Sequence, residues 1–351
     1  MNKEFWKNKK VFITGHNGFK GSWLSIWLTE LGAKVYGYSL KPKTKPSLFE
    51  TCFLDKKVSS VTGDIRDYEK LKKTIISVQP DIVIHMAAQA LVLESYKNPI
   101  ETYQTNLMGT VNILNVIREV SSTKAFINVT SDKCYENKKN FKAFKESDPM
   151  GGFDPYSSSK ACSELITAGY RASFFKNSVS IATVRAGNVI GGGDWAVDRI
   201  IPDFVKKMNQ NQKISIRNPK AIRPWQFVLE PLSGYLTLAE KLFLKGSDYA
   251  EAWNFGPDNQ EDKSVEWLIS KFDKEYGGGN NFRILLNDNL PHEANYLKLD
   301  CSKSIERLDW HPKLKIEKCI SLTSDWYKNF YEKEKDMYRF SVEQIKQFEL
   351  I

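Results

Sequence analysis

Residues 11–21, "VFITGHNGFKG", decide the fold of this chain. A short apolar run ends at Thr14, and three glycines (Gly15, Gly18 and Gly21) follow before a helical pattern begins. Glycine lets a loop turn tightly and approach a pyrophosphate, which then lies at the N-terminus of the next helix. The stretch predicts a dinucleotide site, with a merely tight turn as the alternative. The expected cofactor contacts in this loop are Gly15, Asn17, Gly18, Phe19 and Gly21.

The same alternation of apolar run and amphipathic stretch continues through the first half of the chain. Buried strands are expected at 10–14, 34–38, 81–87, 125–129 and 181–186. Repeated β-α-β units predict an α/β fold with a doubly wound parallel sheet of the Rossmann type. We expect residues 1–187 to form the cofactor domain with the catalytic residues. Residues 188–351 should form a smaller, interwoven substrate-binding region, with segments near 223–256 returning to the first domain.

Composition excludes several classes of protein. The chain has 351 residues and a formal net charge of +9, but its lysines are dispersed, so no nucleic-acid partner is expected. Five cysteines without a C-x-x-C pair and four scattered histidines indicate reduced thiols and no metal site. No long apolar segment or signal-like N-terminus occurs, so we expect a cytoplasmic protein without membrane contact.

The end of the second predicted strand should contact the ribose of the cofactor. An acid often occupies that position in NAD enzymes, whereas this chain has Ser39, with Lys41 and Lys43 close by. NAD is therefore expected, and NADP is not excluded. Asp64 and Ile65, after the third strand, are expected near the adenine; for Asp64, an acid at a helix N-terminus is the alternative.

A tyrosine and a lysine stand four residues apart in "DPYSSSKACSEL" (154–165). On a helix, Tyr156 and Lys160 share one face, and an ammonium beside a phenol is expected to lower the tyrosine pKa. Such a phenol can accept a hydroxyl proton while hydride leaves the same carbon. Ser131, at the end of the preceding strand, can hydrogen-bond to the same hydroxyl.

Several motifs together resemble the extended short-chain dehydrogenases/reductases. The glycine spacing G-x-x-G-x-x-G is the form that this family uses. The other motifs are "HMAAQ" (85–89), "TSDKCYEN" (130–137), "YSSSK" (156–160), "RAGNVIGGGDW" (185–195), "RPWQFVLEPLSGY" (223–235) and "HEANYLKLDCSK" (292–303). Within the family, the chain is most similar to the sugar-nucleotide 4,6-dehydratases that act on CDP-glucose. The resemblance implies a tightly held NAD, a CDP-hexose substrate, a 4-keto-6-deoxy product and a homodimer or higher homo-oligomer.

The resemblance also implies roles for particular residues. Ser131, Tyr156 and Lys160 form the oxidation group, and Asp132 and Lys133 serve the elimination. Asp132 would protonate the leaving C6 hydroxyl and Lys133 would remove the C5 proton, which requires the neutral form of the pair; Glu136 is the alternative base. Ala87 and Ala88, together with Tyr156 and Lys160, join the cofactor contacts. The implied substrate contacts are Gln89, Asn188, Arg199, Arg217, Arg223, His292 and Tyr296.

Two departures and three alternatives remain. The family pattern more often has Pro at position 90 and Arg at 93, where this chain has Ala90 and Leu93, so sugar choice is in question. A dehydratase for GDP-mannose or dTDP-glucose is one alternative. A sugar-nucleotide 4-epimerase is another, although it needs no acid and base for C5 and C6. A nucleotide-binding protein without catalysis would not need Tyr156 and Lys160.

Overall fold

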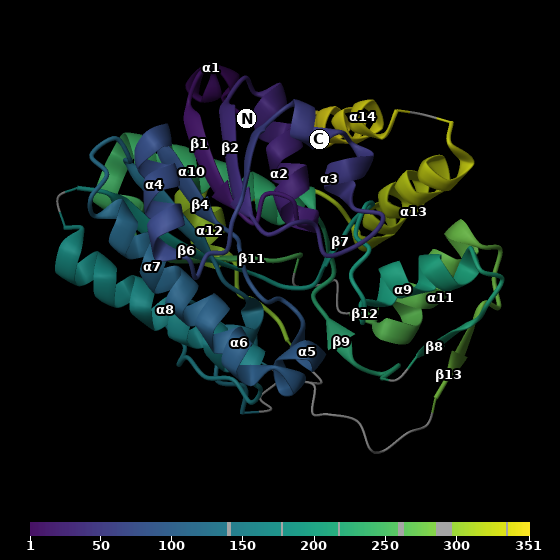
Figure 1. Ribbon diagram of the computed structural model, residues 1–351. Helices are drawn as coiled ribbons and strands as arrows, with labels where there is room; N and C mark the ends of the chain where they lie inside the picture. The colour runs from purple at the N-terminus through teal and green to yellow at the C-terminus, as the bar shows by residue number, and fades with distance from the viewer. Residues whose placement is uncertain (139–141, 177, 217, 259–262, 286–296, 335) are drawn as a thin grey trace.

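A seven-stranded parallel sheet forms the centre of the computed structural model (Figure 1). The strands lie in the order β11-β6-β5-β4-β1-β2-β3, which is the predicted doubly wound arrangement with two strands added. Their bounds are β1 (Lys10–Thr14), β2 (Lys34–Ser39), β3 (Ser59–Thr62), β4 (Ile82–His85), β5 (Ala125–Val129), β6 (Ser180–Ala186) and β11 (Ala252–Phe255). The structure describes residues 1–138, 142–176, 178–216, 218–258, 263–285, 297–334 and 336–351.

Helices cover both faces of this sheet because its inner strands are apolar on both sides. On β1, Val11 and Ile13 face one apolar cluster, and Phe12 faces the other. The first cluster includes residues of α2 (Phe19–Glu30) and α10 (Leu229–Lys245). The second is covered by α4 (Tyr68–Val78), α7 (Gly109–Ile117) and α8 (Pro155–Phe174), which lie side by side in Figure 1.

Local sequence explains where the two helices nearest the candidate site begin. Gly18 is the N-cap of α2 and provides no side-chain cap, so the first amides of this helix remain available to a ligand. The α8 helix starts at Pro155, and the Asp154 carboxylate accepts a hydrogen bond from the Ser157 amide at 2.9 Å. This cap fixes the first turn of α8, which carries Tyr156.

The second half of the chain adds short strand pairs and helices beside the large sheet. The pairs are β7 (Val189–Ile190) with β10 (Gln226–Phe227), β9 (Ile222–Arg223) with β12 (Lys263–Ser264), and β8 (Ile214–Ile216) with β13 (Phe282–Ile284). The helices are α9 (Ile200–Met208), α11 (Val265–Tyr276), α12 (Ser302–Leu308), α13 (Ile316–Glu332) and α14 (Met337–Leu350). Within 223–256, β11 pairs with β6, and α10 packs on β5 and β6.

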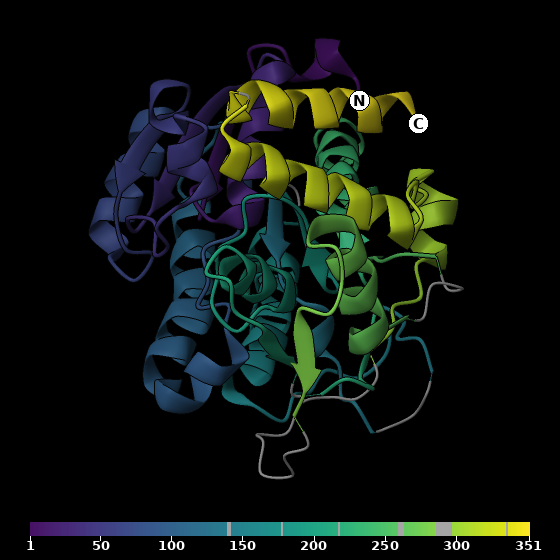
Figure 2. The ribbon, with the colours of Figure 1, turned by 90° about the vertical axis from the view of Figure 1, so that its right-hand side faces the viewer.

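The end of the chain returns to its beginning. Figure 2 shows α13 and α14 running across the molecule, with the two termini near each other. Helix α14 packs on α2, and Trp27 donates a hydrogen bond to Glu349 at 2.9 Å. The remaining helical segments are α1 (Lys3–Trp6), α3 (Leu48–Thr51), α5 (Val92–Lys97), α6 (Pro99–Tyr103) and the 3-10 and π segments η1 (Leu54–Lys56), η2 (Gln104–Met108), η3 (Asp132–Cys134) and η4 (Gly246–Tyr249). No helix in the described ranges is long and apolar enough to cross a membrane.

Candidate active site

The glycine loop forms a cradle between β1 and α2. Gly15 has a φ of +74°, and a Cβ there would lie 2.8 Å from the Ala87 nitrogen. A Cβ at Gly21 would lie 2.2 Å from the Gly15 carbonyl oxygen. At Gly18, in contrast, a Cβ would meet only one atom, at 3.4 Å, so its bare backbone faces open space. These residues fit the pyrophosphate of a dinucleotide at the N-terminus of α2.

The end of β2 is organised by a histidine that the sequence analysis did not single out. His16 is buried, with Nδ1 3.0 Å from Ser39 Oγ and Nε2 2.7 Å from Ser60 Oγ. Burial lowers the pKa of His16 to about 4, so the ring is neutral. The hydroxyl of Ser39, predicted to contact the ribose, therefore already has a partner, and Gly37 is required because a Cβ there would lie 2.2 Å from the His16 ring.

Three other predicted cofactor contacts, Asn17, Asp64 and Ile65, have defined local surroundings. The Asn17 side chain donates to the Leu40 carbonyl at 2.6 Å, which ties the glycine loop to the residue after β2. Arg66 binds the Asp64 carboxylate, with Nη2 2.6 Å from Oδ2, and this hydrogen bond holds the pKa of Asp64 below its ordinary value. Asp67, rather than Asp64, is the N-cap of α4, and Ile65 is buried. The Asp64 carboxylate thus has a local partner before any adenine is bound.

A cavity of about 1180 Å³ opens at the carboxyl ends of the central strands. The predicted residues on its wall are Phe19, Ser131, Asp132, Lys133, Tyr156, Asn188, Arg199 and Arg223. Positions 90 and 93, where the chain departs from the family pattern, also line it. Residues widely separated in sequence are therefore brought to one space.

Tyr156 and Lys160 share one face of α8, as predicted, but their surroundings differ from the expected electrostatics. Burial raises the pKa of Tyr156 to about 12, and interaction with Ser131 only partly offsets this effect. The prediction of a lowered phenol pKa is thus wrong for the protein without bound ligands. Lys160 donates to the Val129 carbonyl at 3.1 Å, and burial lowers the pKa of its ammonium to about 8. A dry environment penalises both charged forms.

Asp132 and Lys133 begin the short turn η3 directly after Ser131. Ser131 Oγ donates to Asp132 Oδ1 at 3.1 Å and accepts from the Lys133 amide at 3.2 Å. The second Asp132 oxygen, Oδ2, is buried and has no hydrogen-bond partner within the described part of the chain. Glu136, the alternative base, forms an ion pair with Lys138 at 3.1 Å and is not among the residues lining the cavity.

The predicted substrate contacts divide into three groups. Arg199 lies on the cavity wall, with Nη1 2.8 Å from Asp194 Oδ2, and Asp194 raises the pKa of this guanidinium. Asn188 and Arg223 line the same cavity. The amide of Gln89 instead binds Leu91 and Thr102 inside the protein and does not line the cavity. Arg217, His292 and Tyr296 lie outside the described residues.

One cavity residue was missed by the sequence analysis. Lys20, between Phe19 and Gly21, lines the cavity. Burial, followed by repulsion from Arg199 and Lys160, lowers its pKa to about 8, and Asp132 acts in the opposite direction. The only signal in the sequence was a lysine between Phe19 and Gly21 in the glycine-rich stretch.

Comparison with known proteins places this chain in a family. The family model described as GDP-mannose 4,6 dehydratase matches residues 12–323. The CDP-glucose 4,6-dehydratase of Salmonella typhimurium is 51% identical over 334 residues, which cover 93% of each chain. The chain belongs to the sugar-nucleotide dehydratase family. This assignment confirms the extended short-chain dehydrogenase/reductase membership that the motifs indicated.

A more distant relative resembles this chain in sequence, and two solved structures resemble it in fold. The dTDP-D-glucose 4,6-dehydratase of Homo sapiens is 27% identical, over 92% of this chain and 91% of that one. The dTDP-glucose 4,6-dehydratase of Bacillus anthracis, solved in complex with NAD, has a TM-score of 0.78 at 20% identity. The match covers 92% of the present chain and 98% of the Bacillus anthracis chain. The UDP-glucose 4-epimerase of Thermotoga maritima, solved with UDP-glucose, has the same TM-score at 22% identity, covering 92% and 99% of the two chains. Dehydratases and epimerases thus share this fold, so fold alone does not separate them.

Proposed function

We propose that the protein converts CDP-glucose to CDP-4-keto-6-deoxyglucose by C4 oxidation, loss of water across C5–C6 and return of hydride to C6. The observation that carries this proposal is the position of Asp132 and Lys133 on the cavity wall, beside Ser131 and Tyr156. A 4-epimerase would need the oxidation group but no second acid and base. The 51% identity to a CDP-glucose enzyme supports CDP-glucose over GDP-mannose or dTDP-glucose.

For the oxidation, Tyr156 takes the proton of the C4 hydroxyl, and Ser131 orients that hydroxyl. Lys160 lies one helical turn from Tyr156, and its hydrogen bond to the Val129 carbonyl links α8 to the end of β5. The raised pKa of Tyr156 means that the phenol must be activated when the ligands bind. Positive charge beside the phenol lowers its pKa, and Arg199 already acts in that direction.

For the elimination, Lys133 removes the C5 proton once C4 is a ketone, and Asp132 protonates the leaving C6 hydroxyl. The buried Oδ2 of Asp132, without a partner among the described residues, supports its role as the oxygen that carries this proton. This step uses the neutral form of the pair, in which Asp132 carries the proton and Lys133 is the free amine. Lys133 lines the cavity and Glu136 does not, which supports Lys133 over Glu136 as the base.

We propose NAD as the cofactor, held by Gly15, Gly18 and the first amides of α2. Bound NAD supplies the hydride acceptor at C4 and the hydride donor at C6, so the cycle consumes no net cofactor. Asn17, Phe19, Ser39, Asp64, Ile65, Ala87 and Ala88 are the further proposed contacts. An NAD-bound dehydratase of the same fold supports this assignment, although Lys41 and Lys43 leave NADP possible.

The substrate diphosphate is proposed to bind Asn188, Arg199 and Arg223, since fixed cationic donors neutralise its charge. In this scheme, residues 1–187 hold mainly the cofactor and residues 188–351 mainly the sugar nucleotide. The strand β11 and helix α10 are the parts of the second region that join the large sheet.

We further propose a homodimer that works in the cytoplasm. Three large apolar side chains are exposed on adjoining segments: Ile100 of α6 (73%), Met108 of η2 (46%) and Leu165 of α8 (61%). An apolar surface of this kind supports association between copies. All five cysteines lie in described segments and none forms a disulfide, which fits a reducing compartment. Light scattering of Leu165→Glu should give a lower mass than that of the native chain; equal dimer mass would place the interface elsewhere.

Parallel reactions with CDP-glucose, GDP-mannose and dTDP-glucose test the proposed substrate. We expect CDP-glucose to give a product lighter by one water at a rate well above those of the other two. Preference for GDP-mannose or dTDP-glucose would reject CDP-glucose as the substrate, and an isomer of unchanged mass would favour an epimerase.

A further inference from the structure

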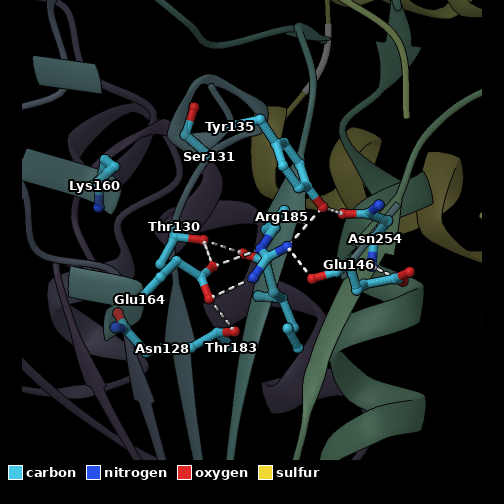
Figure 3. A network of polar contacts seen from close by, with 12 residues as sticks. Asn128, Thr130, Ser131, Tyr135, Glu146, Lys160, Glu164, Thr183, Arg185 and Asn254 are labelled. Atoms are coloured by element: carbon cyan, nitrogen blue, oxygen red, sulfur yellow. Dashed lines mark hydrogen bonds and ion pairs between the residues drawn. The ribbon is translucent and has the colours of Figure 1, made fainter. Parts of the chain in front are cut away.

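A buried ion pair lies directly below the candidate active site. Glu164 of α8 and Arg185 of β6 are joined by two hydrogen bonds, of 2.8 Å from Nε to Oε1 and 2.9 Å from Nη2 to Oε2 (Figure 3). Their side chains are 5% and 4% exposed. The Glu164 carboxylate also accepts hydrogen bonds from the hydroxyls of Thr130 and Thr183. Both oxygens of the Glu164 carboxylate thus accept hydrogen bonds from side chains inside the protein.

The pair is built on the same helix as the oxidation group. Tyr156, Lys160 and Glu164 follow one another at intervals of four residues and therefore lie along one face of α8. Only Tyr156 reaches the cavity wall; Lys160 and Glu164 lie further along the helix and away from it. A residue that is hydrogen-bonded to Glu164 is therefore held in a defined position relative to Tyr156.

Two residues attach the segment that carries the elimination pair to this ion pair. At one end, the hydroxyl of Thr130, which precedes Ser131, donates to Glu164 Oε1, and the Thr130 amide donates to the Val184 carbonyl at 2.9 Å. At the other end, Tyr135 Oη accepts from Arg185 Nη1 at 2.6 Å and donates to Asn254 Oδ1 at 2.7 Å. Figure 3 shows Tyr135 above Arg185, with Thr130 and Glu164 on the other side of the guanidinium. The segment from Thr130 to Tyr135 is held at both ends by one ion pair.

The ring of Tyr135 is fixed as firmly as its hydroxyl. It stacks on Phe144 with a centroid distance of 4.9 Å and an angle of 7° between the planes. The Arg185 guanidinium carbon lies 4.8 Å from the centre of the Tyr135 ring. Removing only the hydroxyl therefore leaves the packing of the ring in place and removes the hydrogen bonds with Arg185 and Asn254.

We infer that Tyr135 is a positioning residue for the elimination step, acting through its hydrogen bond with Arg185. Lys133 is two residues from this anchor, whereas Ser131 is next to the other anchor, Thr130. Releasing Tyr135 should therefore displace Lys133 and Asp132 more than Ser131. Displacement of a reacting group by about 1 Å costs roughly 100-fold in rate. This inference rests on the proposed dehydratase function and adds a residue that sets the balance between its two steps.

Tyr135→Phe tests the inference in the full-length protein, with CDP-glucose and NAD in a rapid-quench single turnover. Mass spectrometry separates the oxidised hexose, lighter than substrate by two hydrogens, from the dehydrated product, lighter by one water. We expect C4 oxidation within about threefold of the native rate and dehydration slower by roughly 10- to 100-fold, so that the oxidised hexose accumulates. Exchange of the C5 hydrogen with solvent deuterium should fall in parallel with dehydration.

Tyr338→Phe is the matched control. Tyr338 is also a buried tyrosine with a hydrogen-bonded hydroxyl, which donates to the Glu30 carboxylate at 2.8 Å. It lies on α14, whose residues do not line the cavity. The Tyr338→Phe variant should have an altered thermal stability but should not accumulate the oxidised hexose. If Tyr135→Phe does not fold, as judged by circular dichroism, Arg185→Lys makes the same test because a lysine can keep the charge beside Glu164 and lose the bond to Tyr135.

The outcomes separate this inference from the proposed function. If the native protein does not dehydrate CDP-glucose, the proposed function fails. If the native protein does and Tyr135→Phe slows oxidation and dehydration equally, or slows neither, the positioning role is overturned. Accumulation of the oxidised hexose in Tyr135→Phe but not in Tyr338→Phe supports it.

Discussion

Replacing Glu164 by Gln removes one charge from the buried ion pair and keeps the size of the side chain. Arg185 then stays buried without its counter-charge, and breaking a buried pair in this way costs about 3–5 kcal/mol. Unfolding entropy of about 2.1 cal/mol/K per residue over 351 residues converts this into a fall in Tm of roughly 4–7 °C. Thermal unfolding of native and variant protein at one scan rate measures the difference.

Glu119→Gln is the control for this prediction. Glu119 pairs with Lys72 at 2.7 Å, but both side chains are exposed, 43% and 32% respectively, so the pair contributes little. The Tm of Glu119→Gln should therefore match that of the native protein within error. Equal Tm values for the two variants would refute the reasoning that burial, rather than the ion pair as such, sets the cost.

Three further predictions concern the site and its pH dependence. Tyr156→Phe should lower C4 oxidation by roughly 10²–10⁴ while cofactor and CDP affinity, measured by calorimetry, stay near native values; native turnover would mean that another group is the base. Lys133→Met should retain C4 oxidation but lose exchange of the C5 hydrogen with solvent deuterium, and exchange at the native rate would leave Lys133 only an electrostatic role. His85 is buried, and burial lowers its pKa to about 3 from an ordinary 6.5. Between these values the unfolded chain binds a proton that the folded chain does not, so stability falls as pH falls. As the pH falls from about 6 to 4, the urea-unfolding free energy of the native protein should decline more steeply than that of His85→Gln. We expect the two slopes to differ by about 1.4 kcal/mol per pH unit, and equal slopes would contradict this.

Local patterns predicted the fold because the inner strands of the central sheet, such as β1 and β5, are apolar and buried on both faces. The runs at 10–14 and 125–129 match β1 and β5 residue for residue. The strand β3 was harder to place from its residues because Ser59–Thr62 is mostly exposed and polar, at the edge of the sheet. Likewise, β11 follows a long helix, and only its pairing with β6 places it in the sheet.

The candidate site was predictable where spacing along one element determines geometry, as for Tyr156 and Lys160 on α8. Contacts between distant elements carried no such signal. The side chains that hold Gln89 and Ser39 come from Thr102 and His16, and nothing in the local sequence links these pairs. The pKa of Tyr156 was predicted in the wrong direction because the prediction counted the nearby ammonium but not the burial that the folded cavity imposes.

The most direct measurement of the central claim follows a deuterium label from C4 of CDP-glucose. If the protein is a redox-neutral dehydratase, the label appears at C6 of a product that has lost one water, and reduced cofactor does not build up. Return of the label to C4 in an isomer of unchanged mass would indicate an epimerase. Transfer of the label to stoichiometric reduced cofactor would indicate a simple dehydrogenase, and either result would contradict the account.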